Sequence, residues 1–170
     1  RAEYGDEHLA RLRVIAALAD ARGLPLSRVK DILTLIDDPD PDPISALGKA
    51  VSALPPYVDE GRDDFPLAKE AIEVLGLTYD SSFTAVPQLD DAIRALKHAE
   101  LDTSPETLRR YADAMRMIAV DEIAPISDMS RQEAVAYSVL GTALYEPLML
   151  ALRRLEHQHL LATGASAGQL

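Results

Sequence analysis

The sequence predicts an all-α protein, and three observations support this fold class. Hydrophobic residues make up 48% of the 170 residues and aromatic residues only 5%, a composition rich in alanine and leucine that favours helices. Apolar residues recur every three or four positions in several segments, as they do on one face of a helix. Asp42-Pro43 and Ser104-Pro105 each combine a capping side chain with a proline suited to the first helical position.

Residues 4–36 predict a tight pair of helices. The first helix carries one apolar stripe at helical spacing, made by Leu9, Leu12, Ile15 and Leu18. Gly23 follows where a helix commonly ends in a left-handed residue. The second, shorter helix is expected to bury Leu26, Val29, Ile32 and Leu33. Five basic residues remain on the outside of the pair: Arg11, Arg13, Arg22, Arg28 and Lys30.

This stretch resembles the MerR-type transcriptional regulators. In that family a winged helix-turn-helix ends in a tyrosine and is followed by an acidic helix start, a Leu/Ile-rich helix, a glycine turn and a second helix of Leu-x-x-Ile-Lys-x-Ile-Leu type. The matching positions here are Tyr4, Asp6-Glu7, Leu9 through Leu18, Gly23, and Leu26 through Leu33. The resemblance covers about the first fifth of the chain, and its specificity lies in the combination of these pieces.

The resemblance implies a regulator that binds double-stranded promoter DNA as a homodimer. Residues 1–36 would be the remaining part of the DNA-binding domain, because the helix that enters the major groove in this family is expected before Arg1. Contacts to DNA phosphates are expected from Tyr4, Arg11, Arg13, Arg22 and Arg28, with Lys30 beside them. The alternative for the basic residues is an ordinary solvated helix face.

The net charge of −11 argues against nucleic-acid binding by the chain as a whole. The charge is uneven, because residues 1–36 carry six basic and five acidic side chains and the remainder therefore carries −12. An almost neutral N-terminal segment followed by an acidic remainder fits a DNA-binding regulator, and it also fits an ordinary acidic protein.

The remaining chain divides into a linker, a helical domain and a tail. Residues 37–64 form a Pro-rich linker with a short helix at 44–54, which is too short for the long coiled coil that joins dimers in this family. Residues 65–162 form a C-terminal effector or dimerisation domain with helices at 65–75, 88–99, 105 to about 125, and 131–161. Residues 77–87 favour a loop over an extended segment, and residues 163–170 a disordered tail.

The last predicted helix is the second landmark of the chain. Ser130 and Glu133 form a capping box at its start, and residues 134–152 are apolar on most sides. A helix of this kind lies in the centre of a bundle or between subunits, so it is the candidate dimer interface. Pro147 removes one backbone hydrogen bond and is expected to kink the helix.

Aromatic and methionine side chains of the C-terminal domain suggest a pocket for a small hydrophobic effector. The candidate pocket residues are Phe83, Tyr111, Met115, Tyr137, Tyr145 and Met149. The resemblance implies such a pocket, since relatives without metal ligands often sense organic molecules. The alternative for these residues is plain core packing.

No residue pattern predicts catalysis, a metal site or a cofactor. The chain has no cysteine, whereas the mercury, copper and zinc sensors of the family use cysteine ligands. His157 and His159 are two residues apart, which places them on different helix faces. Gly141-Thr142 is an isolated glycine, and Glu122 and Glu146 favour a solvated or paired role. We therefore expect a non-enzyme in the cytoplasm with no membrane span. The alternatives are an acidic helical protein-interaction module and, less favoured, a helical enzyme.

Overall fold

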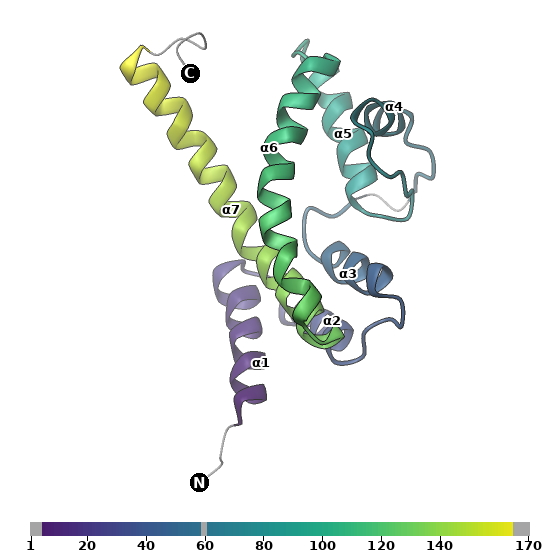
Figure 1. Ribbon diagram of the computed structural model, residues 1–170, viewed down its shortest axis with the longest axis vertical. Helices are drawn as coiled ribbons and strands as arrows, with labels where there is room; N and C mark the ends of the chain where they lie inside the picture. The colour runs from purple at the N-terminus through teal and green to yellow at the C-terminus, as the bar shows by residue number, and fades with distance from the viewer. Residues whose placement is uncertain (1–4, 59–60, 165–170) are drawn as a thin grey trace.

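The computed structural model describes residues 5–58 and 61–164, and every regular element in these ranges is a helix (Figure 1). The all-α prediction is therefore confirmed. In chain order the elements are α1 (Asp6–Ala16), the π-helical η1 (Ala17–Ala21), α2 (Leu26–Asp37), α3 (Pro43–Ser52), α4 (Pro66–Leu75), α5 (Ala85–His98), α6 (Pro105–Ile123), the 3₁₀-helical η2 (Ala124–Asp128) and α7 (Arg131–Thr163).

Local capping signals determine where several of the helices begin or end. The side chain of Ser104 accepts a hydrogen bond from the N–H of Thr107, and that of Asp42 accepts one from the N–H of Ser45. Ser130 and Glu133 form the predicted capping box. Gly76 ends α4 with φ at 65°, in the left-handed region that glycine adopts without a steric penalty. The predicted caps at Asp42, Ser104 and Ser130 are therefore confirmed.

Helix boundaries differ most at α5, which begins at Ala85 where the sequence predicted a start at Gln88. Pro87 lies in its first turn, where a missing backbone N–H costs nothing because that group has no partner within the helix. The long final helix runs without a break past Pro147 to Thr163. The predicted disordered tail falls almost wholly on residues 165–170, outside the described residues.

The main hydrophobic core joins the N-terminal helices to the last one. The face of α7 that carries Val135, Val139 and Ala143 packs against α2, α3 and η1. The rest of this core comes from Val14, Leu18, Leu24, Val29, Ile32, Leu33, Ile36, Ala46, Ala50 and Leu54. Segments that are far apart in the sequence therefore share one core.

Two predictions for the helix pair need correction. Leu26 is 75% exposed, because it is the first residue of α2 and lies about one turn before Val29, the first buried residue of that helix. Leu9 and Leu12 are 45% and 49% exposed, since α1 contacts the main core only through its C-terminal part, at Val14, and through η1, at Leu18. The apolar stripe exists, but only its last turns are buried.

A second, smaller core lies between α4 and α5. It consists of Phe65, Ala68, Ile72 and Val86, with Leu89 packed against it. Helix α6 packs beside α4, yet no side chain of α6 is buried in the described structure. Several large apolar side chains of α6 are exposed, among them Tyr111, Met115 and Met117.

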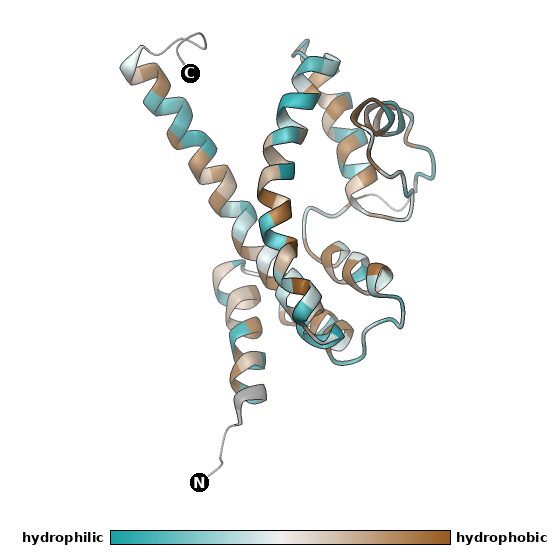
Figure 2. Cartoon of the chain, viewed as in Figure 1, coloured by the Kyte–Doolittle hydropathy of each residue, from teal (hydrophilic) through white to brown (hydrophobic). Residues whose placement is uncertain are grey.

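The C-terminal half of α7 extends away from the rest of the molecule (Figures 1 and 2). Its exposed apolar residues include Leu144, Tyr145, Leu148, Leu150, Leu152 and Leu155. By length and composition α7 could cross a membrane, because an 18-residue window in it has a mean hydropathy of 1.4. The sequence analysis did not predict a helix of this kind. One such helix is weak evidence for a membrane protein.

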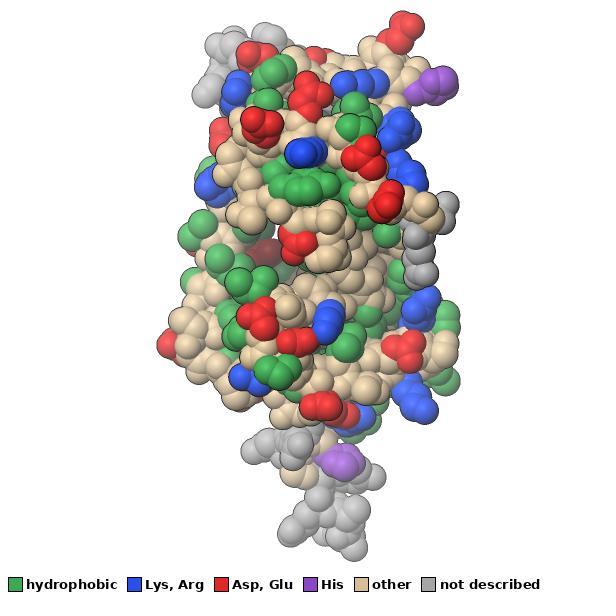
Figure 3. Space-filling view, turned by 90° about the vertical axis from the view of Figure 1, so that its right-hand side faces the viewer, with side chains coloured by type: hydrophobic (Ala, Val, Ile, Leu, Met, Phe, Trp, Pro, Cys, Tyr) green, Lys and Arg blue, Asp and Glu red, His purple; other side chains and the backbone are tan. Residues whose placement is uncertain are grey.

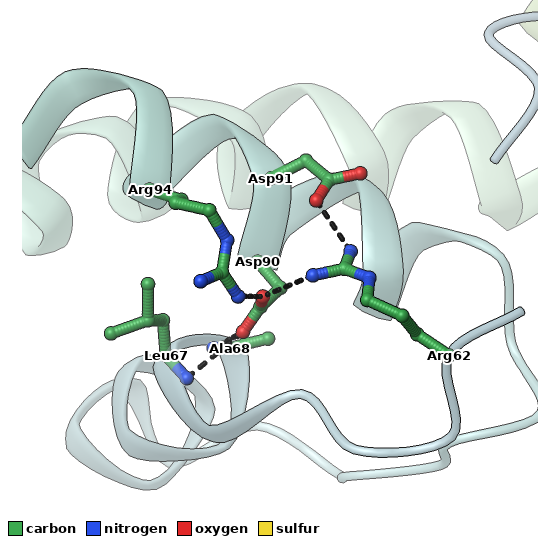
Figure 4. A network of polar contacts seen from close by, with 6 residues as sticks. All are labelled: Arg62, Leu67, Ala68, Asp90, Asp91 and Arg94. Atoms are coloured by element: carbon green, nitrogen blue, oxygen red, sulfur yellow. Dashed lines mark hydrogen bonds and ion pairs between the residues drawn. The ribbon is translucent and has the colours of Figure 1, made fainter. Parts of the chain in front are cut away.

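A buried carboxylate fastens α5 to the start of α4 (Figure 4). Asp90 is fully buried, and its Oδ1 accepts hydrogen bonds from the backbone N–H groups of Leu67 and Ala68, at 2.9 and 3.1 Å. Its Oδ2 lies 2.6 Å from Nη2 of Arg94 and 3.2 Å from Nη1 of Arg62. Asp90 thus caps the N-terminus of α4, where free amides and the helix dipole favour a negative charge.

Burial raises the pKa of Asp90, but the hydrogen bonds from Ala68, Arg94 and Leu67 outweigh burial and hold the pKa below its ordinary value of 3.8. A carboxyl group whose pKa is lower in the folded state stabilises that state above its unfolded pKa. This stabilisation is lost as the pH falls through the folded pKa. The network therefore contributes at neutral pH and weakens below about pH 4.

We expect Asp90→Ala to lower the free energy of unfolding by about 3 kcal/mol at pH 7, because it leaves the amides of Leu67 and Ala68 without an acceptor, removes the carboxylate that faces Arg94, and leaves Arg62 with Asp91 alone. Asp91→Ala is the matched control, since Asp91 also pairs with Arg62 but is half exposed. Urea denaturation of the three proteins measures the difference. Equal losses for the two variants would contradict a special role for the buried carboxylate.

Candidate functional site

A cavity of about 720 Å³ lies between α3, the loop at 78–84, the end of α6 with η2, and α7. The space-filling view shows a hollow between the upper and lower parts of the molecule, with apolar and acidic side chains around it (Figure 3). Pockets that bind drug-sized molecules have volumes of about 300–1,000 Å³ and mostly apolar walls. The cavity is large enough to bind such a molecule.

Helix α7 forms one wall of the cavity with a face different from the one that it buries in the main core. The α7 residues that line the cavity are Tyr137, Ser138, Gly141, Thr142 and Tyr145. The buried face carries Val135, Val139 and Ala143. At about 100° of rotation per residue these two sets lie on adjacent sides of the same turns. A displacement of α7 by a bound molecule would therefore act directly on the core that holds α2 and η1.

The opposite wall is built by α3 and by the turn at residues 80–83. Ile44, Leu47 and Val51 supply apolar surface from α3. In the turn, Oδ1 of Asp80 accepts hydrogen bonds from the N–H and the hydroxyl of Ser82, at 2.9 and 2.6 Å, and the N–H of Phe83 donates to the Asp80 carbonyl at 3.1 Å. This turn holds Phe83 at the cavity.

Half of the predicted pocket residues lie together at this cavity. Phe83, Tyr137 and Tyr145 line it. Tyr111 and Met115 are exposed on α6, and Met149 lies on α7 beyond the cavity, so these three do not line it. The periodic pattern marked the aromatic and methionine residues but gave no information about which helices face one another.

Sequence reasoning missed most of the other lining residues. Ile44, Leu47 and Val51 have the spacing of an ordinary core face of α3, and Ile123 and Ile126 flank a helix end. Two glycines inside helices, Gly48 and Gly141, were the only signal that could have indicated a cavity. A glycine at such a position usually weakens a helix and so requires a reason.

Of the residues that the structure describes, three charged side chains line the cavity: Lys49, Asp80 and Glu122. Nζ of Lys49 lies 2.5 Å from Oδ2 of Asp40, and this hydrogen bond, with one from the N–H of Asp42, lowers the pKa of Asp40. The hydrogen bonds from Ser82 lower the pKa of Asp80, so its carboxylate is ionised at neutral pH. Glu122 is partly buried, and its side chain has no hydrogen bond or ion pair within residues 5–58 and 61–164.

The basic residues of the helix pair have different surroundings. Arg11 contacts both carboxylate oxygens of Asp37, at 2.5 and 2.7 Å, and Arg28 lies over the ring of Tyr57, 5.0 Å from its centre. Arg13 and Lys30 are exposed. Tyr4 falls outside the described residues. The proposed phosphate contacts stay predictions; within the described residues, Arg13 and Lys30 are exposed and show no ion pair or ring contact.

Arg22 connects the helix pair to α7. Its Nη2 lies 3.7 Å from Oε2 of Glu146, the residue next to Tyr145 of the cavity wall. Burial raises the pKa of Glu146, and the charge of Arg22 opposes this rise only in part. At 3.7 Å the pair is a long ionic contact, so the ionised form of Glu146 is not fully compensated.

The described residues contain no group of three or more His, Asp or Glu side chains arranged to hold a metal ion. His157 and His159 are exposed near the end of α7.

Comparison with known proteins gives one match. Residues 1–35 match the family of MerR HTH family regulatory proteins, which indicates that this region is of MerR type and suggests a DNA-binding regulator. Searches of curated proteins and of solved structures gave no match. Proteins of this family bind DNA and are not enzymes.

We expect Glu146→Gln to keep or raise the stability at pH 7. The folded protein binds the proton of Glu146 more tightly than the unfolded chain does, so the wild type loses stability as the pH rises from the unfolded pKa through the raised folded pKa. The glutamine variant has no titrating group at this position and does not lose this stability. Urea denaturation of both proteins at pH 4 and pH 7 measures the difference in their free energies of unfolding. A loss of stability at pH 7 alone would indicate that the contact with Arg22 dominates.

Proposed function

We propose that the protein is a MerR-type transcriptional regulator that binds promoter DNA as a homodimer in the cytoplasm. Its effector is a small, mainly apolar molecule that occupies the cavity between α3 and α7. The observation that carries this proposal is the double role of α7, which lines the cavity with one face and completes the core of the MerR-type helix pair with another.

The DNA-binding part of the proposal is supported by the family match and by the charge distribution. Arg13 on α1 and Lys30 on α2 are exposed on the part of the chain that matches the family. Contacts to phosphates from such residues position a protein on DNA without reading the base sequence. All of the net negative charge lies beyond residue 36, because residues 1–36 carry a net charge of +1.

The dimer part of the proposal is supported by a stripe on the C-terminal half of α7. Tyr145, Leu148, Leu152 and Leu155 are separated by three, four and three residues, which is the spacing of the apolar seam in a coiled coil. All four side chains are between 44% and 58% exposed. The stripe continues the cavity-lining face of α7, and Tyr145 belongs to both, so dimerisation and effector binding would involve one helix face.

A helical interaction module is the second candidate function. The observation in its favour is that apolar side chains of both α6 and the distal half of α7 are exposed. Such a protein would bind a partner through these helices and would not require DNA.

We expect the protein from its complete reading frame to bind DNA upstream of its own gene. Arg13→Ala with Lys30→Ala should weaken binding and reduce the slope of log K against log salt concentration by about one for each phosphate that the variant no longer neutralises. Arg153→Ala with Arg154→Ala on distal α7 removes the same charge and is the control. Fluorescence anisotropy at several salt concentrations measures both variants.

Equal effects of the two double variants would contradict a DNA surface at the helix pair. Failure of the complete wild-type protein to bind at low salt would favour the interaction module.

We expect Leu152→Glu to convert a dimer into monomers, because it places a charge in the proposed seam. Leu150→Glu is the matched control, since Leu150 is equally exposed but lies two residues away on the opposite side of α7. Analytical ultracentrifugation of both variants and of the wild type measures the mass in solution. A monomeric wild type, or equal disruption by both substitutions, would contradict this interface.

A further inference from the structure

We propose that a second copy of the chain packs the C-terminal half of its α7 along an exposed apolar stripe of α6, and that the end of this partner helix closes the cavity between α3 and α7. The inference rests on the proposed homodimer. It adds which helices meet, in which direction they run, and what the partner subunit contributes to the cavity.

Helix α6 carries an apolar stripe that its own subunit leaves largely exposed. Tyr111, Met115 and Ile118 are 55%, 45% and 37% exposed. Glu122 follows on the same side, so the four residues of this α6 stripe are separated by four, three and four positions. This is the spacing of an apolar seam that a second helix covers.

The α6 stripe and the stripe on α7 begin at the same cavity. Glu122, the last residue of the α6 stripe, and Tyr145, the first residue of the α7 stripe, both line it. From the cavity the two helices diverge (Figure 1), and in the parts of the chain that the structure describes α6 does not pack along α7. Within one subunit, therefore, neither stripe covers the other.

The α7 stripe has the spacing and the length that the α6 stripe requires. One step beyond Leu155 it reaches His159, which is also exposed. Leu148, Leu152, Leu155 and His159 are then separated by four, three and four positions, as on α6, and each stripe is about 16 Å long. With the two helices parallel, the pairs in order are Tyr111 with Leu148, Met115 with Leu152, Ile118 with Leu155, and Glu122 with His159.

The charge of Glu122 decides the direction in which the partner helix runs. The parallel arrangement places the carboxylate opposite the imidazole of the partner's His159 and leaves three purely apolar pairs. The antiparallel arrangement would place Glu122 opposite the partner's Leu148. The side chain of Glu122 has no hydrogen bond or ion pair in the described parts of the chain, and covering a carboxylate with leucine is costly unless another group pairs with it. The parallel arrangement is therefore favoured.

The parallel arrangement also agrees with two-fold symmetry. Helices α6 and α7 run in opposite directions within a subunit (Figure 1). A partner α7 that is parallel to α6 is therefore antiparallel to α7, as a two-fold axis perpendicular to the helices requires. Rotation about this axis places the α7 stripe of each subunit on the α6 stripe of the other. Both exposed stripes are buried at once, in a bundle of four helices.

The partner subunit then contributes to the cavity. Because the partner's His159 lies at Glu122, the end of the partner's α7 reaches the cavity wall formed by Glu122, Ile123 and Ile126. Leu161, which is 84% exposed in its own subunit, gains apolar neighbours there. The cavity is complete only in the dimer, so a molecule bound in it also stabilises the dimer.

Cross-linking between subunits tests this arrangement, because the 170 residues contain no cysteine. Complete protein with Ile118→Cys is mixed with complete protein with Leu155→Cys, the mixture is oxidised, and mass spectrometry identifies the linked peptides. We expect a disulfide between positions 118 and 155. Met117→Cys in place of Ile118→Cys is the matched control, since Met117 is 75% exposed but lies about 100° around the helix from the α6 stripe. No link from position 118, or an equally efficient link from position 117, would overturn the inference.

Exchange of the paired charges tests the predicted contact between Glu122 and the partner's His159. We expect Glu122→Lys and His159→Glu each to raise the Kd of the dimer by about tenfold, and the double variant to return it close to the wild-type value. Asp113→Lys is the control, because Asp113 is exposed on α6 outside the stripe. Sedimentation equilibrium measures the Kd. A double variant as weak as either single variant would overturn the contact and the direction of the partner helix.

The inference and the proposed function fail in different ways. A dimer that Leu152→Glu disrupts and Ile118→Glu does not would overturn the inference, because α6 would take no part, and would leave the proposed homodimer in place. A monomeric wild type would overturn both the inference and the proposed homodimer. The DNA-binding measurement on the complete protein decides separately whether the protein is a regulator.

Discussion

The packing of the first half of α7 against α2, α3 and η1 is the interaction on which the rest of the structure depends. Val135, Val139 and Ala143 complete a core whose other side chains come from the first 54 residues. Without this contact the MerR-type helix pair would have exposed apolar residues on its inner side, and the cavity would lose one wall. Because the same turns of α7 serve both the core and the cavity, the two parts of the protein cannot move independently there.

The cavity and the exposed stripe on distal α7 follow from this arrangement. Helix α7 is anchored at its start, lines the cavity in its middle and extends free of the core beyond Glu146, where Leu148, Leu152 and Leu155 remain exposed. The Asp90 network holds α4 and α5 together as a second, smaller unit beside the cavity. The loop that carries Phe83 connects this unit to the cavity wall, so the cavity lies where the two cores meet.

Features determined by a few neighbouring residues could be predicted from the sequence. The caps at Ser104 and Ser130 and the glycine that ends α4 depend on hydrogen bonds within one helical turn. Features determined by tertiary contacts could not. Leu26 is exposed because the buried face of α2 begins only at Val29, and Tyr137 is separated from Met149 because the cavity contacts α7 only between residues 137 and 145. The sequence shows Gly48 and Gly141 as glycines inside predicted helices, but only the structure shows that both of them line one cavity.

We propose that α7 couples the cavity to the MerR-type helix pair, and coupling between two sites is reciprocal. Hydrogen–deuterium exchange of the complete protein, with and without its promoter DNA, tests this claim without knowledge of the effector. We expect DNA binding to change the exchange of amides in α7 around residues 134–145 and in the loop at 78–84, in addition to the helix pair. A change confined to residues 5–37 would contradict the claim, because the cavity would then be independent of DNA binding.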